Sequence, residues 1–257
     1  MILKLPSLII IFIIFLPSYL FAKGTAGNAA NLESRFIVDM PTAGVIPEKS
    51  FGFYAQFFNN GGLALELSAA PFESFSMAIA FSGSNIIGSD EPVFQKYPGV
   101  HIRYRLLDET ISFPAITAGI STQGRGIYSK THERFATLSP GLFLASSKAF
   151  RWALGQLSFH GGIGFSFEAA TPDKAPNYWL GLEQSVGNNF SFNLEYNAQL
   201  DDNNRLYLSK RGLLNAAFRL SVAGGLTLEL SARDLLIHQT RLRGFTRFIG
   251  LEFISRF

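Results

Sequence analysis

The sequence contains no cysteine among its 257 residues. Disulfide bonds, thiolate metal sites, iron–sulfur clusters and cysteine nucleophiles are therefore excluded. Charge is also scarce: Asp, Glu, Lys and Arg make up 16% of the chain, whereas roughly 25% is usual for a soluble domain. The 22 basic and 19 acidic residues give a net charge of +3. This near balance of charge gives no electrostatic reason to expect a nucleic-acid partner.

Metal-binding patterns are missing as well. The four histidines (His101, His132, His160 and His238) lie in none of the spacings typical of metal sites, so we predict no metal and no cofactor. Apolar residues, in contrast, make up 47% of the chain, with 26 Phe and 24 Gly. That content excludes intrinsic disorder and points to a membrane protein or an all-β protein.

The first 22 residues are typical of a secretory signal peptide. Lys4 precedes an apolar run from Leu8 to Leu16, Pro17 ends the run, and Ala22 offers a small residue for cleavage. The run is shorter than the ~20 residues that a membrane-spanning helix needs. A retained transmembrane anchor is the alternative. Residues 23–47 are expected to form an extended N-terminal segment before a β-barrel over 48–257.

From about residue 48 the chain alternates apolar and polar residues with a period of two, which predicts strands. In one example Phe192, Leu194 and Tyr196 share a face opposite to Asn193 and Glu195. Twelve strands are predicted, with ten or fourteen as alternatives: 50–58, 62–70, 74–83, 99–107, 112–122, 137–147, 155–168, 176–186, 189–200, 212–222, 225–235 and 245–257.

The predicted connections alternate between short turns and long loops, which is typical of an outer-membrane barrel. The expected fold is an all-β, antiparallel, up-and-down transmembrane β-barrel, closed by pairing of the N-terminal and C-terminal strands. An even strand number brings both termini to the short-turn, periplasmic rim. Keeping the apolar faces together pairs Leu182 with Leu194, and Arg219 with Glu229 as a cross-strand ion pair.

The distribution of lysine indicates which face meets lipid. All seven lysines after Lys4 fall in predicted loops or at strand ends, whereas a soluble sheet places Lys on its solvent face. The polar faces carry mostly Ser, Gly, Ala, Asn and Thr, which suits a crowded, wet lumen. A secreted soluble β-barrel or β-sandwich that binds a ligand in its interior is the alternative.

The C-terminus carries a second indication of the outer membrane. Ile249, Leu251, Phe253 and the terminal Phe257 alternate along the last strand, which looks like the insertion signal that the barrel assembly machinery recognises. We therefore predict the cell outer membrane as the location. The expected partners are that machinery, outer-membrane lipid and lipopolysaccharide.

Several stretches resemble YjbH-like bacterial outer-membrane barrel proteins, which are linked with exopolysaccharide production. The stretches are PTAGVIPEKSFGF (41–53), SNIIGSDEPV (84–93), PGVHIRYRLLDE (98–109), FPAITAGISTQGRG (113–126) and SPGLFLASSK (139–148). The resemblance lies in the first 150 residues. It implies an outer-membrane location and a role with surface polysaccharide, and it supplies no catalytic motif.

No catalytic residues are predicted. A set of Ser158, His160 and Glu168 would lie on one strand, where residues eight apart are about 26 Å from one another. The charges expected in the lumen include Arg103, Arg105, Glu195, Arg219, Glu229 and Arg233. They would either line a selective channel or form a paired network that fills the barrel. A narrow pore, or one plugged by residues 23–47, is expected for a barrel of this size.

The predicted function is that of a porin-like, non-enzymatic, integral barrel of the Gram-negative envelope. Its role would be in envelope structure, surface-polysaccharide export or passive solute passage. Two alternatives belong to other classes: an outer-membrane enzyme that modifies lipid, and the secreted ligand-binding protein.

Overall fold

The computed structural model describes residues 33–168, 175–187, 189–222, 225–240 and 244–256. The proposed signal peptide lies outside these residues. The strands are β1 (Ser50–Phe58), β2 (Gly62–Ala70), β3 (Phe75–Ser84), β4 (Val93–Phe94), β5 (Gly99–Leu107), β6 (Ala115–Ser121), β7 (Arg125–Ser129), β8 (Arg134–Thr137), β9 (Gly141–Trp152), β10 (Gly155–Phe165), β11 (Asn177–Val186), β12 (Phe190–Asn197), β13 (Leu213–Ser221), β14 (Leu226–Arg233) and β15 (Thr246–Arg256). None of the described residues belongs to a helix that is long and apolar enough to cross a membrane.

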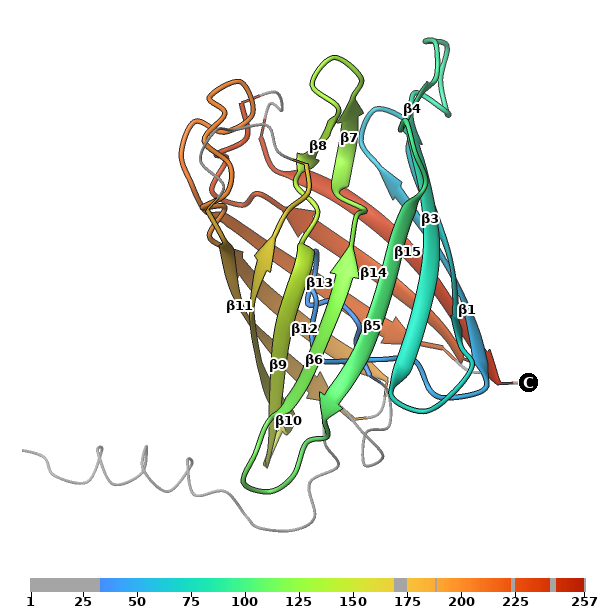
Figure 1. Cartoon of the computed structure of the whole chain (residues 1–257), viewed down its shortest axis with the longest axis vertical. Helices are drawn as coiled ribbons and strands as arrows, with labels where there is room; N and C mark the ends of the chain where they lie inside the picture. Colours follow the sequence, from blue (N-terminus) through green and yellow to red (C-terminus); the bar gives the residue numbers. More distant parts are fainter. Residues whose placement is uncertain (1–32, 169–174, 188, 223–224, 241–243, 257) are drawn as a thin grey trace, which may run out of the picture.

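Twelve antiparallel strands form a closed barrel (Figure 1). The first strand, β1, pairs with β2 on one side and with the last strand, β15, on the other. The order continues through β14, β13, β12, β11, β10, β9, β6, β5 and β3, and β3 returns to β2. β4 pairs with β3 outside the ring. The predicted fold class and strand number are thus confirmed.

The strand register follows the apolar alternation. Leu182 lies opposite Leu194, and Arg219 lies opposite Glu229, as predicted. The Arg219 Nε donates to Glu229 Oε2 over 2.8 Å. Because each residue type keeps to its own face from strand to strand, a slip of one residue would move apolar side chains into the interior.

The two rims of the barrel differ in their connections. Short links at 71–74 and 153–154 lie on the rim where β1 begins and β15 ends, which we call the short-turn rim. Longer links at 85–98, 122–140 and 198–212 lie on the opposite, long-loop rim. The 59–61 turn between β1 and β2 is a short link on that second rim. This asymmetry agrees with the predicted pattern.

The link at 122–140 contains structure that the sequence analysis missed. It was predicted as a loop over 123–136, yet β7 and β8 pair as a separate two-stranded sheet, which we call the outer hairpin (residues 125–137). Its strands are short, and the register shifts between Arg125 and Tyr128. Alternation this brief is too weak to identify a strand pair from sequence.

Apolar side chains cover the outside of the barrel. Leu67, Leu180 and Leu230 each expose more than half of their surface, and their strand neighbours Glu66, Trp179 and Glu229 are buried. Further exposed apolar residues lie on nearly every strand of the ring: Phe53, Leu65, Ile79, Phe81, Ile102, Leu144, Phe159, Leu182, Phe192, Phe218 and Ile249. A continuous belt of this kind is far larger than a monomeric soluble protein exposes, and it matches a lipid-facing surface.

Candidate functional site

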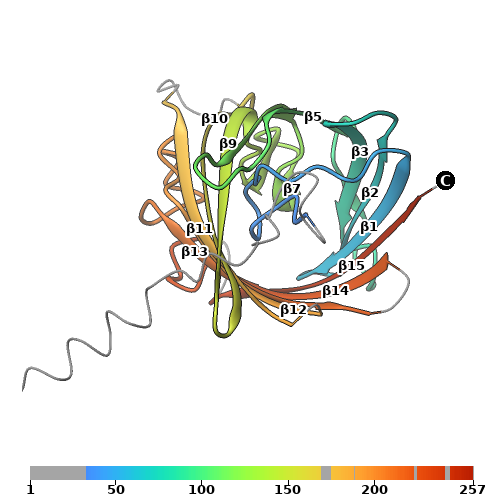
Figure 2. The same cartoon turned by 90° about the horizontal axis from the view of Figure 1, so that it is seen from below.

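The interior of the barrel is occupied by residues 33–46, which we call the inner segment. Seen along the barrel, this part of the chain lies within the ring of strands (Figure 2). Residues 35 and 37–46 are buried. A twelve-stranded barrel is wider than the eight-stranded kind that its own side chains fill. The inner segment supplies the missing volume.

The inner segment folds back on itself. Phe36 and Pro41 form an isolated antiparallel bridge, and the Ile37 amide donates to the Met40 carbonyl over 2.8 Å. Near the two ends, the Val45 amide donates to Glu33 Oε2 over 2.8 Å. The ends lie near Arg105, towards the short-turn rim, and the tip around Asp39 lies near Arg233, at the other end of the barrel. The segment is therefore a loop that reaches up the lumen.

Side chains of most ring strands hold the inner segment. Glu195 is central, because its Oε2 accepts the amides of Val38, Asp39 and Met40 over 2.8–2.9 Å. The other polar wall residues that contact the segment are Glu66, Arg103, Arg105, Thr117, Ser147, Trp179, Asn215, Arg219, Arg233 and Glu252. Most of these contacts join residues far apart in the sequence.

Arginine side chains bind the backbone of the inner segment as well as its acids. Arg103 donates to the Arg35 carbonyl over 2.5 Å, and its guanidinium lies 4.4 Å from the centre of the Phe36 ring. Arg105 donates to the Ala43 carbonyl over 2.9 Å and pairs with the carboxylate of Glu33. Arg219 donates to the Phe36 and Ile37 carbonyls over 3.0 and 2.9 Å.

Ion pairs between charged side chains of the inner segment and the wall also hold the segment in place. Arg35 of the inner segment donates to Glu66 over 2.6 Å and to Glu252 over 2.5 Å. Asp39 forms an ion pair with Arg233, whose Nε lies 2.7 Å from Asp39 Oδ1. The six predicted lumen residues thus all face the interior, and Arg103, Arg105, Glu195, Arg219 and Arg233 contact the inner segment directly, while Glu229 pairs with Arg219. Their proposed role in a channel stays a prediction.

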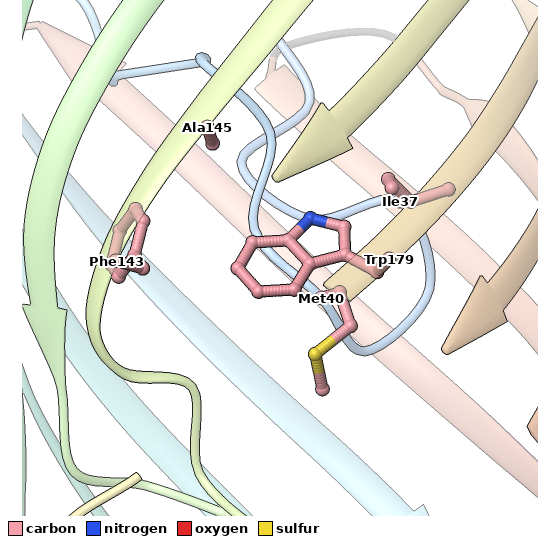
Figure 3. Packing of buried hydrophobic residues seen from close by; sticks show 5 residues of the cluster. All are labelled: Ile37, Met40, Phe143, Ala145 and Trp179. Carbon is pink, nitrogen blue, oxygen red and sulfur yellow. The ribbon is translucent and has the colours of Figure 1, made fainter. Parts of the chain in front are cut away.

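A small apolar cluster packs the tip of the inner segment against the wall (Figure 3). Ile37 and Met40 lie against Trp179, Phe143 and Ala145. The Trp179 indole also donates to the Pro41 carbonyl over 2.9 Å. At Gly181 an added Cβ would lie 2.6 Å from the Ile37 side chain. The glycine therefore leaves the space that Ile37 fills.

Two Ser–His–Glu sets occur on the inner wall. Ser147 Oγ lies 2.8 Å from His160 Nδ1, and His160 Nε2 lies 3.5 Å from Glu183. Ser121, His101 and Glu66 form the second set, with distances of 2.8 and 3.3 Å. Glu168, in contrast, accepts the amides of Phe135 and Ser139, away from His160.

The placement of these sets favours a structural role. Ser147 Oγ also accepts the Ala43 amide over 3.0 Å, and Glu66 is paired with Arg35. Both serines are buried in the lumen beside the inner segment, whereas the substrate of a lipid-modifying enzyme lies outside the barrel. Among the described residues, no group of three or more His, Asp or Glu is placed to hold a metal ion.

The outer hairpin packs against the tip of the inner segment, towards the long-loop rim. Arg125, at its start, lies 4.4 Å from the Phe36 ring centre and 4.0 Å from Asp39, both in the inner segment. At its other end, Arg134 donates to both Asp202 oxygens, over 2.9 and 2.5 Å, and lies over the Tyr207 ring. The hairpin thus joins the inner segment to the 198–212 loop.

Breaking the Arg134–Asp202 pair is expected to loosen the outer hairpin. Both side chains are fully buried, and removing one partner of a buried pair costs about 3–5 kcal/mol. We expect Arg134→Gln to speed hydrogen exchange of residues 125–137 by at least tenfold. Lys130→Gln, at an exposed hairpin position, is the control. Unchanged exchange in Arg134→Gln would contradict the role given to this pair.

The same loops are expected to respond to pH. Burial raises the pKa of Asp201 to about 7, and the nearby carboxylates of Asp202 and Glu168 act in the same direction. A raised pKa in the folded state means that the protonated carboxyl favours folding. Its contribution is complete below the unfolded pKa of about 4, and it is lost as the pH rises through about 7. Limited proteolysis of the 198–212 loop should therefore be slower at pH 5 than at pH 8 after correction for protease activity. Asp201→Asn should remove most of that difference, and an unaltered difference would refute the assignment.

The predicted insertion-signal residues lie on β15. Ile249 and Phe253 are exposed on the apolar belt, and Leu251 is half-buried between them. Phe257 lies outside the described residues. Recognition of this strand by the assembly machinery stays a prediction.

Taken together, the closed ring, the apolar belt and the filled lumen define a transmembrane β-barrel with an internal segment. No family model matches the chain, and no curated protein matches it. Among solved structures it is similar to a KdgM porin (TM-score 0.47, 9% identity, covering 79% of this chain and 98% of that one). A NanC porin has a TM-score of 0.44 at 9% identity, covering 80% and 99%. A Salmonella typhi OmpF in complex with daunomycin has a TM-score of 0.32 at 6% identity, covering 80% and 97%. These distant similarities assign no solute to this chain.

Proposed function

We propose that this chain is an integral barrel of the Gram-negative outer membrane that provides passive passage for solutes, and that its inner segment closes the passage. The observation that carries this proposal is the contact set of residues 33–46. They are held in the lumen by hydrogen bonds and ion pairs with wall residues. Such contacts can be exchanged for hydrogen bonds with water, so the closed state can be reversed.

The composition of the wall that faces the inner segment favours a pore rather than a permanently packed interior. It carries charged side chains such as Arg103, Arg105 and Glu195, which make a wet lining once the segment leaves. A permanently closed interior would be at least as stable with apolar side chains in place of these charges, since buried ion pairs add little net stability. The exposed apolar belt supports the membrane location.

A permanently closed scaffold of the envelope is the second candidate. The number and burial of the contacts around Glu195 and Arg219 favour it. The resemblance to YjbH-like proteins would add a role with surface polysaccharide, and this role stays a prediction.

Planar-bilayer conductance separates the two candidates. Refolded full-length protein is expected to be mostly closed, with rare stepwise openings. A variant that lacks residues 33–46 is expected to show larger and more frequent steps. If that variant folds, as shown by resistance to unfolding in detergent, and remains silent, the passage function is wrong and the scaffold is favoured.

A further inference from the structure

A cavity lies beside the tip of the inner segment, between the outer hairpin and the ring strands. It measures about 60 Å³, which is room for a few water molecules or one small oxyanion. The outer hairpin contributes Arg125 and Thr137, β14 contributes Arg233, and the neighbouring loops contribute Tyr207 and Gln239. Half-buried Asn59 and Ser129 lie at its margin, towards the long-loop rim.

The charge of the lining is one-sided. Two arginines and no acidic residue contribute to it. Arg125 and Arg233 are both at least nine-tenths buried. Two guanidinium groups this deeply buried are costly unless anions and hydrogen-bond acceptors compensate them.

The compensation within the described part of the chain is incomplete. Arg233 Nη1 donates to Gln56 Oε1 over 3.4 Å, whereas Nη2 and Nε have no hydrogen-bond partner among the described residues, although Nε lies 2.7 Å from Asp39. Arg125 Nε lies 4.0 Å from the Asp39 carboxylate, which is too long for a hydrogen bond. Asp39 of the inner segment is therefore the carboxylate that lies near both guanidinium groups. Arg125 and Arg233 also line the cavity.

We propose that this cavity binds a small oxyanion, a carboxylate or a phosphate, between Arg125 and Arg233. Guanidinium groups recognise both kinds of oxyanion through charge-assisted hydrogen bonds. Thr137, Tyr207 and Gln239 also line the space. Gln239 Nε2 donates to Thr137 Oγ1 over 3.1 Å, and the Tyr207 hydroxyl lies 3.0 Å from His132 Nδ1. The bound anion competes with Asp39 for the two arginines. Binding from the long-loop side thereby weakens the hold on the tip of the inner segment. This consequence rests on the proposed function, whereas the binding itself does not.

Calorimetric titration of the refolded full-length protein tests the site. Sodium phosphate and sodium acetate are the probes, with sodium chloride at equal ionic strength as the reference. Saturable binding of at least one oxyanion is expected. Affinity should fall by about tenfold or more in Arg125→Gln and in Arg233→Gln. Arg211→Gln, at an exposed position in a long loop, should bind as the wild type does. Heat-dependent migration on gels shows that each variant is folded.

Asp39→Asn tests the competition. Removing the competing carboxylate should tighten oxyanion binding by about tenfold, whereas a site independent of Asp39 would be unchanged. Phosphate should also speed tryptic cleavage at Arg35 in the wild type. Absent binding, or equal binding in Arg125→Gln and the wild type, would overturn the proposal. If the protein binds phosphate but never conducts, the oxyanion site is supported and the passage function is wrong. If it conducts but does not bind an oxyanion, the passage function is supported and the oxyanion site is wrong.

Discussion

Replacing Glu195 by alanine is expected to release the inner segment and open the barrel. The carboxylate accepts three consecutive backbone amides, from Val38 to Met40, and its other oxygen accepts Asn215 Nδ2 over 2.8 Å. Alanine leaves these buried donors unsatisfied, at a cost of roughly 1–3 kcal/mol for each. Several kcal/mol is enough to reverse an equilibrium between a closed and an open state.

Two measurements check this expectation. Planar-bilayer recordings should show a large rise in open probability for Glu195→Ala. Trypsin should cleave after Arg35, which is buried in the wild type. Glu183→Ala is the matched control: Glu183 is a glutamate on the neighbouring strand β11 whose acid group faces His160. If Glu195→Ala stays closed and Arg35 stays protected, the carboxylate does not hold the segment.

A charge on the outer face of β14 is expected to impair insertion. Leu228 lies opposite Leu220 and Leu251 on the apolar belt. An arginine facing lipid costs up to about 2–4 kcal/mol, and the cost is largest at the bilayer midplane. Leu228→Arg should therefore shift the urea midpoint of folding into lipid vesicles markedly downward.

Leu236→Arg is the control for that experiment. Leu236 is exposed in the loop between β14 and β15, outside the spanning strands. The same substitution there should leave the midpoint close to that of the wild type. Equal midpoints for the two variants would mean that Leu228 does not face lipid.

The barrel itself was predictable from the sequence because its determinants are local. Alternation along each strand shows which side chains share a face, and the turns fix the partners, as the Leu182–Leu194 and Arg219–Glu229 pairs illustrate. The identity of the lumen-facing charges follows from the same pattern. Membrane barrels maintain the alternation of apolar and polar residues closely, since a polar group exposed to lipid without a hydrogen-bond partner is destabilising.

The contacts inside the lumen were not predictable in detail. A plug over residues 23–47 was one interpretation of the sequence, but nothing in it showed that Glu195 would bind amides more than 150 residues earlier. Such contacts depend on the closed ring, which brings distant strands around one short segment. The outer hairpin escaped detection for a different reason: β7 and β8 are short and irregularly paired.

The pairing of β1 with β15 has a consequence for how the molecule is made. The ring closes by the pairing of β1 with β15, so the seam forms only after the chain has been made as far as β15. Arg35 bonds to Glu252 on that last strand as well as to Glu66 near the first. Arg35 thus links β15 to β2, the strand that pairs with β1 on the side away from the seam. The inner segment therefore bonds to strands on both sides of the β1–β15 seam, so it holds the closed ring together as well as filling it.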